Sequence, residues 1–286
     1  MTLTRVLTAL VLIPIVIAIV LFTPTWAVAL ATGIITILAL REYFALGDAI
    51  GHRAYRVWTI FSAAALLYFQ WLNAANSLGS DHFHSLGWHI IGEPLSPAFV
   101  FFLFVLGMTC LTLWTRRPLV ESLPAAGFSS SALLLIAFPL SFAVRLHGLP
   151  RLGPGLLLFA LAITWAADTT AYFVGRAIGK HPLAPHISPK KTWEGSIGSM
   201  IGTLVVAYGF SNWIHIPLHH LLIMAALGNI AGQMGDLFES ACKRSAGVKD
   251  SGGLLPGHGG ILDRIDALIL CLPVIWYYLV LLNPSL

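Results

Sequence analysis

The chain has 286 residues, of which 57% are hydrophobic and only 10% are charged. Soluble domains carry about 25% charged residues, so this composition excludes disorder, a coiled coil, a collagen-like rod and an ordinary cytosolic enzyme. The 16 basic and 12 acidic residues give a formal net charge of +4, which is too small a surplus to indicate a nucleic-acid partner. We therefore expect an integral membrane protein.

Apolar windows without Asp, Glu, Lys or Arg follow one another along the chain, and each is long enough to span a bilayer as a helix. Residues 6–40 form a pair of spans with a break at residues 23–26. One span each is expected within 57–80, 94–115, 122–144 and 152–167, two within 195–235, and the last within 267–286. The sequence therefore predicts an all-α, polytopic protein with about nine transmembrane helices.

Basic residues near the span ends predict the orientation, because Lys and Arg favour cytoplasmic loops. If the N-terminus is inside, only Arg145 and Arg151 among the basic residues fall outside. This distribution predicts an N-in, C-out chain. A cleaved signal peptide over residues 6–22 is the alternative, but a second charge-free run follows it at once.

The ionisable residues divide the chain into two regions. Residues 1–150 hold about five spans, the fifth ending near 145, and are expected to form a lipid-facing scaffold. Residues 151–286 carry seven of the 12 acidic residues, in cytoplasmic loops and at the adjoining span ends. Because ionisable groups at membrane depth are costly and usually functional, we expect a polar active-site cavity on the cytoplasmic side of this C-terminal region.

A polar stripe ends the eighth predicted span. If the helix continues to Gly247, about 100° per residue puts Asp236, Glu239, Ser240 and Lys243 on one face. A simple ion pair between Lys243 and one of the two acids is the alternative to a functional role.

A glycine-rich loop follows the stripe, with five glycines between residues 252 and 260. Its amides suit a phosphate cradle, although a plain connector would have the same composition, and neither a P-loop nor a Rossmann fingerprint is present. Asp263 and Asp266 come next, one helical turn apart, with Arg264 between them. Such carboxylates, with another Asp on a neighbouring helix, can hold Mg²⁺ and leave positions open for phosphate, whereas Asp263 alone could be a helix cap.

Three further groups could carry chemistry. The adjacent Lys190 and Lys191 could bind phosphate or anchor the chain to anionic headgroups. Asp168 could bind a metal or a hydroxyl group, or pair with Arg176. The histidines of the loop 73–97, His82, His84 and His89, could bind zinc, but incidental histidines in a solvated loop are the simpler explanation.

Residues 240–266 resemble the signature of the phosphatidate cytidylyltransferases, also called CDP-diacylglycerol synthases. They contain the family's Ser-x-apolar-Lys-Arg, Lys-Asp, Pro-Gly-His-Gly-Gly and Asp-Arg-apolar-Asp elements. Cys242 stands where the family usually has an aliphatic residue. The surroundings of Asp168 and the stretch 188–195 are also similar, so the motif resemblance covers about residues 164–270.

The resemblance implies Mg²⁺-dependent transfer of the cytidylyl group of CTP to phosphatidate, giving CDP-diacylglycerol and pyrophosphate in phospholipid biosynthesis. It implies that Asp236 and Asp263 bind the metal and that Ser240 and Lys243 are catalytic, while a further metal ligand, Asp266 or Asp250, is left open. We assign the substrate contacts to Lys190, Lys191, Arg244, Lys249, His258 and Arg264. We also expect the bacterial cytoplasmic (inner) membrane, surrounding lipids as partners and a site facing the cytoplasm; a second, monovalent cation and a homodimer are left open.

Two other functions are considered. A CTP-dependent lipid kinase, or another membrane phosphotransferase, could use the same paired acids but would release CDP and a phosphorylated lipid. An ion-coupled transporter could use the intramembrane Asp168 and Asp236, although no internal repeat is visible in the sequence. The product of the reaction distinguishes these functions from a cytidylyltransferase.

Overall fold

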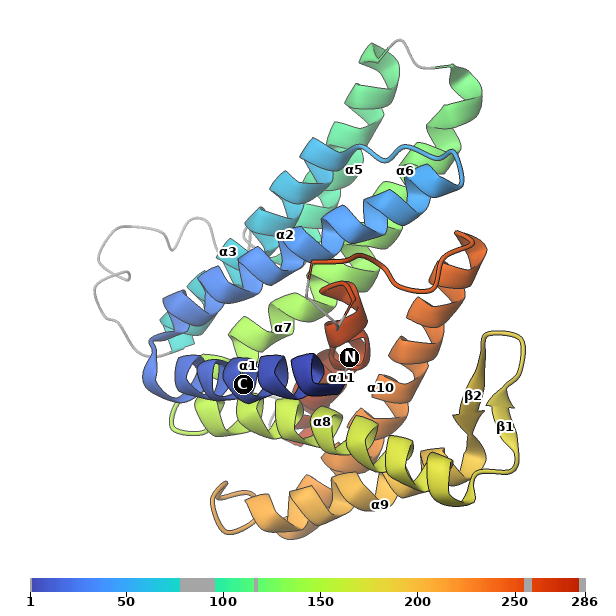
Figure 1. Ribbon diagram of the computed structural model, residues 1–286. Helices are drawn as coiled ribbons and strands as arrows, with labels where there is room; N and C mark the ends of the chain where they lie inside the picture. Colours follow the sequence, from blue (N-terminus) through green and yellow to red (C-terminus); the bar gives the residue numbers. More distant parts are fainter. Residues whose placement is uncertain (1, 78–95, 116–117, 255–258, 283–286) are drawn as a thin grey trace.

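The computed structural model describes residues 2–77, 96–115, 118–254 and 259–282. These residues are helical apart from short connections and one small hairpin (Figure 1). The hairpin, an antiparallel pair of β1 (Pro182–Ala184) and β2 (Ser188–Thr192), is an element that the sequence analysis did not predict. The prediction of a helical membrane protein is confirmed in its main lines.

Helical structure coincides with every predicted window. The helices are α1 (Thr2–Phe22), α2 (Thr25–Ala49), α3 (Arg56–Ser77), α5 (Pro97–Trp114), α6 (Ser122–Ala132), α7 (Phe138–His147), α8 (Gly153–Ile178), α9 (Trp193–Phe210), α10 (Leu218–Ser245) and α11 (Leu262–Leu282). A π-helical turn, Leu133–Ala137, makes α6 and α7 continuous, and a 3₁₀ turn, Leu119–Glu121, precedes them.

Local sequence explains several helix ends. Pro24 separates α1 from α2, because the residue before a proline avoids the helical conformation. The Ser96 side chain caps α5 and the Thr192 side chain caps α9 by accepting a backbone N–H three residues on. After α10, Gly247 adopts a positive φ of 71°, and the amides of Gly247 and Val248 bond back to the last turn. This glycine-based cap ends α10 at the point where the glycine-rich segment begins.

Within the described residues, six helical segments are long and apolar enough to cross a membrane: α2, α5, Leu119–His147, α8, α10 and α11. A shorter apolar helical stretch, Leu10–Phe22, lies in α1. Neither α3 nor α9 meets the same criterion. Polar residues such as Gln70 and Asn73 dilute α3, and Glu194 together with glycine and serine residues dilutes α9. A window without charges is therefore not always apolar enough to span, and the count of nine spans stays a prediction.

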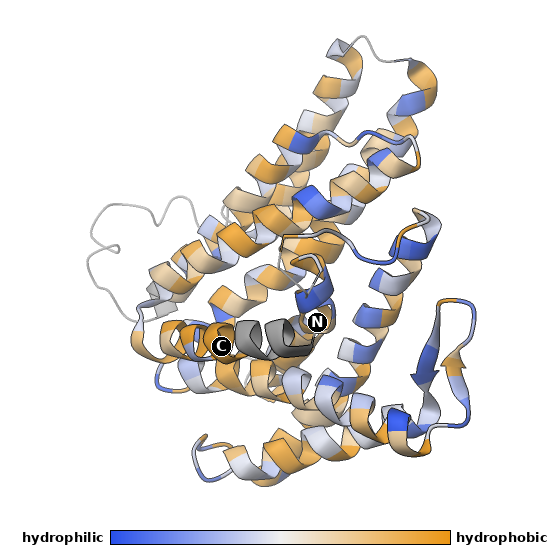
Figure 2. Cartoon of the chain, in the orientation of Figure 1, coloured by the Kyte–Doolittle hydropathy of each residue, from blue (hydrophilic) through white to orange (hydrophobic). Residues whose placement is uncertain are grey.

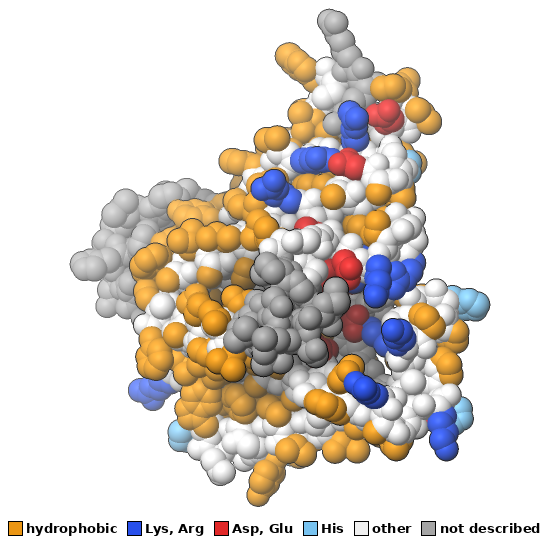
Figure 3. Space-filling view, in the orientation of Figure 1, with side chains coloured by type: hydrophobic (Ala, Val, Ile, Leu, Met, Phe, Trp, Pro, Cys, Tyr) orange, Lys and Arg blue, Asp and Glu red, His pale blue; other side chains and the backbone are white. Residues whose placement is uncertain are grey.

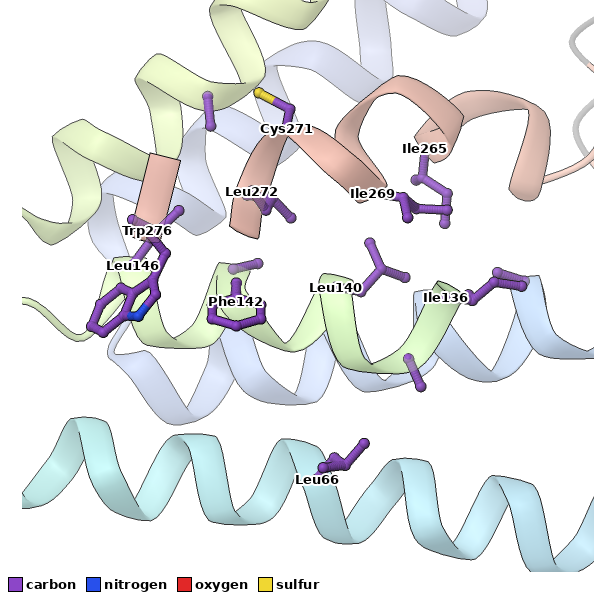
Figure 4. Packing of buried hydrophobic residues seen from close by; sticks show 14 of the residues in the cluster. Leu66, Ile136, Leu140, Phe142, Leu146, Ile265, Ile269, Cys271, Leu272 and Trp276 are labelled. Atoms are coloured by element: carbon purple, nitrogen blue, oxygen red, sulfur yellow. The ribbon is translucent and has the colours of Figure 1, made fainter. Parts of the chain in front are cut away.

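The helices α2, α3, α5 and α6 form an elongated arm, while α8 and α9 lie at the opposite end of the molecule (Figure 1). Between them, α7 packs against both α3 and α11, and α10 packs against α11. The buried contact between α7 and α11 is shown in Figure 4, where Leu140 and Phe142 face Ile269 and Leu272. The two regions on either side of residue 150 thus share one hydrophobic core.

Glycines bring the helices of the C-terminal region close together. A Cβ atom at Gly235 of α10 would lie 2.4 Å from the backbone oxygen of Asp266 of α11. Likewise, a Cβ atom at Gly198 of α9 would lie 2.6 Å from the Val174 side chain of α8. Small residues allow such close approach of membrane helices. The contact at Gly235 sets Asp236, the next residue, beside the first turns of α11.

Candidate active site

Hydrophilic residues lie on α10, at the start of α11 and on the hairpin, as well as at several places along the arm (Figure 2). On the face drawn in Figure 3, acidic side chains lie beside basic ones in the middle, with hydrophobic surface on either side. These elements come from distant parts of residues 151–286. The fold thus gathers the charges of the C-terminal region at one place.

A cavity of about 590 Å³ lies between α8, β2, α9 and α10. Its wall carries Asp168 from α8, Lys190 and Lys191 from β2, and Asp236 from α10, and Ala267 of α11 also lines it. The ammonium group of Lys191 forms an ion pair with the Asp236 carboxylate. The cavity therefore brings together two acids and the two adjacent lysines that the sequence analysis singled out.

Two of the acids that line the cavity, Asp168 and Asp236, interact with a third acid, Asp266, which lies outside the lining. The carboxylates of Asp168 on α8, Asp236 on α10 and Asp266 on α11 repel one another electrostatically. Lys191 and Arg264 supply the opposite charge near Asp168. Where acids neighbour one another, each ionised carboxylate raises the electrostatic cost of ionising the others, and a bound cation would lower that cost.

A neutral chain of hydrogen bonds lines the cavity between α9 and α10. The Ser196 hydroxyl donates to Gln233 Oε1 at 2.5 Å, Gln233 Nε2 donates to Asn229 Oδ1 at 2.6 Å, and Asn229 Nδ2 donates to Ser199 Oγ at 2.6 Å. The sequence analysis missed this group. Asn229 and Gln233 precede Asp236 at helical spacing, so the polar face of α10 begins two turns earlier than predicted.

The hairpin is attached to its neighbours by polar contacts. His181 Nδ1 lies 2.6 Å from Glu194 Oε1, and this hydrogen bond lowers the pKa of the Glu194 carboxyl to about 2. Arg244 at the end of α10 donates to the backbone oxygens of Ile187 at 3.3 Å and Val248 at 2.9 Å. Arg244 therefore connects the hairpin turn with the segment that follows α10, and its expected contact with substrate stays a prediction.

A second charged cluster lies on the polar stripe of α10. Lys243 Nζ is 2.5 Å from Glu239 Oε2 and 2.5 Å from Asp263 Oδ1, and all three side chains are at most 10% exposed. Ser240 is buried on the same helix. The expected helix through this segment is confirmed, and so is the ion pair of Glu239 with Lys243. Asp236 instead pairs with Lys191 on the hairpin.

Residues at the two described ends of the glycine-rich segment, Ser251 and Gly260, bind Asp263. Its Oδ2 atom accepts hydrogen bonds from the amides of Ser251 at 3.0 Å and Gly260 at 2.8 Å, and lies 3.0 Å from the Ser251 hydroxyl. Gly259, between them in the loop, has a φ of 79°, which favours glycine. The amides of Ser251 and Gly260 thus bind a carboxylate, and the phosphate cradle that the sequence analysis weighed against a plain connector stays a prediction.

Glu42 of α2 binds the other side of the loop. Its Oε1 atom accepts the amide of Ile261 at 2.9 Å, and its Oε2 atom accepts the amide of Leu262 at 2.8 Å and the Ser251 hydroxyl at 2.9 Å. The carboxylate that caps α11 is therefore Glu42, not Asp263. The sequence analysis treated residues 1–150 as scaffold and missed this residue, whose only local signal is an acid at the end of a span.

The remaining predicted residues have other surroundings. Arg176 Nη1 donates to the Tyr172 hydroxyl at 2.8 Å, so the alternative that it pairs with Asp168 is not supported. Lys249, Asp250 and Arg264 are exposed. His258 lies outside the described residues, as does the proposed zinc group of His82, His84 and His89.

The side chains were tested for their fit to a metal ion. In the described ranges, no three His, Cys, Asp or Glu side chains are arranged as a metal-binding group, and Asp236 and Asp263 each pair with a lysine. The carboxylates of Asp168, Asp236 and Asp266 are oxygen donors of the kind that Mg²⁺ prefers. Their chemical type therefore suits a hard cation, but a site at Asp236 would require these acids to come together and Lys191 to move away.

Comparisons with known proteins identify a family and several relatives. The profile of the Cytidylyltransferase family matches residues 3–282. Proteins named phosphatidate cytidylyltransferase from Bacillus subtilis and Haemophilus influenzae are 40% and 42% identical to segments of this chain. These alignments cover 55% and 58% of this chain and 59% of each relative, so the chain spans less than two thirds of either relative. A protein of the same name from Brucella abortus is 33% identical over 238 residues, which are 77% of this chain and 83% of the relative. The chain belongs to the Cytidylyltransferase family.

Proposed function

We propose that this chain transfers the cytidylyl group of CTP to phosphatidate, giving CDP-diacylglycerol and pyrophosphate in phospholipid biosynthesis. The observation that carries the proposal is the cavity between apolar helices that is lined by two lysines, Lys190 and Lys191, and two acids, Asp168 and Asp236. Relatives named phosphatidate cytidylyltransferase support it, because the name states both the lipid and the transferred group.

The main requirement of the reaction is that the protein brings two anions together. An anionic phosphate oxygen of phosphatidate attacks the α-phosphorus of CTP, the bond from that phosphorus to the bridging oxygen breaks, and pyrophosphate leaves with the electron pair. The nucleophile is already deprotonated, so orientation and charge neutralisation supply most of the catalysis. Lys190 and Lys191 are suited to neutralise and orient the phosphates.

A magnesium ion would supply charge neutralisation on the leaving pyrophosphate. We propose Asp236 and Asp263 as its ligands, as the resemblance implies. The interaction of Asp266 with Asp236 favours Asp266 over the exposed Asp250 as a further ligand. Binding by Asp263 requires that Lys243, its present partner, turns away. Lys243 would then be free to contact a phosphate oxygen.

The membrane arrangement follows from the substrates. CTP arrives from the cytosol, whereas the acyl chains of phosphatidate stay in the bilayer. We therefore propose a nine-span, N-in, C-out chain in the bacterial inner membrane, with the cavity opening toward the cytoplasm. The apolar outer surfaces of α8 and α9 next to the cavity support access for a lipid from the side.

The identity of the lipid product distinguishes a cytidylyltransferase from a CTP-dependent lipid kinase, which is the nearest alternative function. Purified protein in mixed micelles is incubated with phosphatidate, CTP and Mg²⁺, and the lipids are analysed by mass spectrometry. We expect CDP-diacylglycerol. A lipid carrying only an additional phosphate, with CDP released, would instead identify a CTP-dependent lipid kinase.

A further inference from the structure

We propose that Glu42 is a positioning residue that holds Asp263 and the glycine-rich loop in place for the reaction. The inference rests on the proposed function, in which Asp263 is an active-site acid. It assigns part of the active-site framework to α2, in the region that composition alone marks as scaffold.

The Glu42 carboxylate is the acceptor in all three of its hydrogen bonds to this segment. The two amides come from Ile261 and Leu262 at the start of α11, and the hydroxyl comes from Ser251. The amides at a helix N-terminus carry partial positive charge, which favours a carboxylate at this position. A glutamine would turn its NH₂ group toward one of these donors, so the site is specific for the acid.

Ser251 connects Glu42 to Asp263. Its hydroxyl oxygen lies 2.9 Å from Glu42 Oε2 and 3.0 Å from Asp263 Oδ2, while its amide also donates to Asp263 Oδ2. Asp263 Oδ1 is thereby turned toward Lys243, at 2.5 Å. Displacing Glu42 would release Ser251 and with it the orientation of the Asp263 carboxylate.

Two glycines of the loop, Gly252 and Gly260, lie very close to the Glu42 carboxylate. A Cβ atom at Gly252 would lie 2.6 Å from Glu42 Oε1, and one at Gly260 would lie 2.3 Å from Glu42 Oε2. Real Cβ atoms essentially never approach another heavy atom so closely. The backbone can pass this near only because both residues lack a side chain, so these two glycines serve the contact with Glu42.

The test is a double-mutant cycle on turnover of CTP to CDP-lipid, with Glu42→Gln, Ser251→Ala and the double variant. Since a hydrogen bond to a charged group contributes about 1.5–3 kcal/mol, we expect each single change to lower kcat about tenfold or more. The KM for CTP should stay within about threefold, because neither residue lines the cavity. The double variant should be no slower than the slower single variant, since both act through Asp263.

Asp48→Asn is the matched control, because Asp48 is another acid of α2, exposed and paired with Arg56. It should keep wild-type kcat. Hydrogen exchange on the intact protein is the second readout, and Glu42→Gln should speed exchange at the amides of residues 251 and 260–262 while α8 and α10 stay protected. If Glu42→Gln cannot be recovered as a folded protein, the kcat and the hydrogen-exchange pattern of Ser251→Ala test the inference instead.

A kcat of Glu42→Gln equal to that of the wild type would overturn the inference. So would a double variant whose fold-decrease in kcat equals the product of the two single decreases, because the two residues would then act independently. Loss of protection throughout the protein would likewise assign Glu42 a purely structural role. If the wild-type protein forms no CDP-lipid, the proposed function fails, and the exchange measurement then tests the loop contact by itself.

Discussion

The ion pair between Lys191 and Asp236 joins the hairpin to α10 inside the cavity. It is half-buried, with 27% and 28% of the two side chains exposed, so either partner can change its contacts when an anionic ligand or a cation arrives. The cluster of Lys243, Glu239 and Asp263 is more deeply buried. The first pair can therefore exchange its partners more easily than the second.

Lys191→Met removes the charge while keeping much of the side-chain volume. Loss of a charge-assisted contact to phosphate should lower kcat/KM for CTP by about 10- to 100-fold, which corresponds to about 1.5–3 kcal/mol. Steady-state kinetics measure the change, with Lys180→Met as the control because Lys180 is exposed and does not line the cavity. Equal kcat/KM values for the wild type and Lys191→Met would remove Lys191 from the substrate site.

Asp263→Asn replaces the carboxylate with an amide of almost the same size. We expect turnover to fall by at least about 100-fold, because both the proposed metal ligand and the partner of Lys243 are lost. Size-exclusion chromatography should still give a monodisperse, folded protein. Near-normal turnover at saturating Mg²⁺ would show that Asp263 is not a metal ligand.

At the scale of elements, the close contact of α10 with α11 decides where the acids meet. Gly228, Gly232 and Gly235 of α10 all face α11, and the approach is closest at Gly235. Because these glycines let α10 and α11 approach each other, Asp236 and Asp266 come close together. The polar stripe thus depends on small residues as much as on charged ones.

Gly235→Ala should force α10 and α11 apart, since its Cβ atom would lie 2.4 Å from the Asp266 backbone oxygen. Overpacking of this kind costs about 1–3 kcal/mol, so we expect a lower melting temperature together with reduced turnover. Gly127→Ala on α6 is the control, because nothing lies within 4 Å of its Cβ position. A melting temperature for Gly235→Ala equal to that of Gly127→Ala would contradict the packing described above.

Local patterns predicted the elements better than their contacts. The windows without charges coincide with the helices, and the spacing of Asp236, Glu239 and Lys243 correctly indicated a continuous helix. The hairpin was missed because residues 182–192 carry prolines and lysines and show no strand alternation. Glu42 could not have been found locally, since 209 residues separate it from Ser251. A contact between residues so far apart in the chain produces no regular spacing that a single sequence could reveal.

At the scale of the whole molecule, the expected orientation places the hairpin and the cavity on the cytoplasmic side. A cysteine introduced at His186, in the exposed hairpin turn, should react with a membrane-impermeant maleimide in inside-out vesicles but not in intact spheroplasts. The unsubstituted protein gives the background from its own three cysteines. Preferential labelling in spheroplasts would reverse the proposed topology.

The measurement that tests the account most directly follows two labels of CTP in parallel reactions with the purified protein, phosphatidate and Mg²⁺. The account predicts that the α-phosphate label enters the lipid and that the γ-phosphate label appears in pyrophosphate, in equal amounts. Both signals should disappear in Asp263→Asn. Transfer of the γ-phosphate label to the lipid, or no labelled lipid from folded wild-type protein, would contradict the assignment as a phosphatidate cytidylyltransferase.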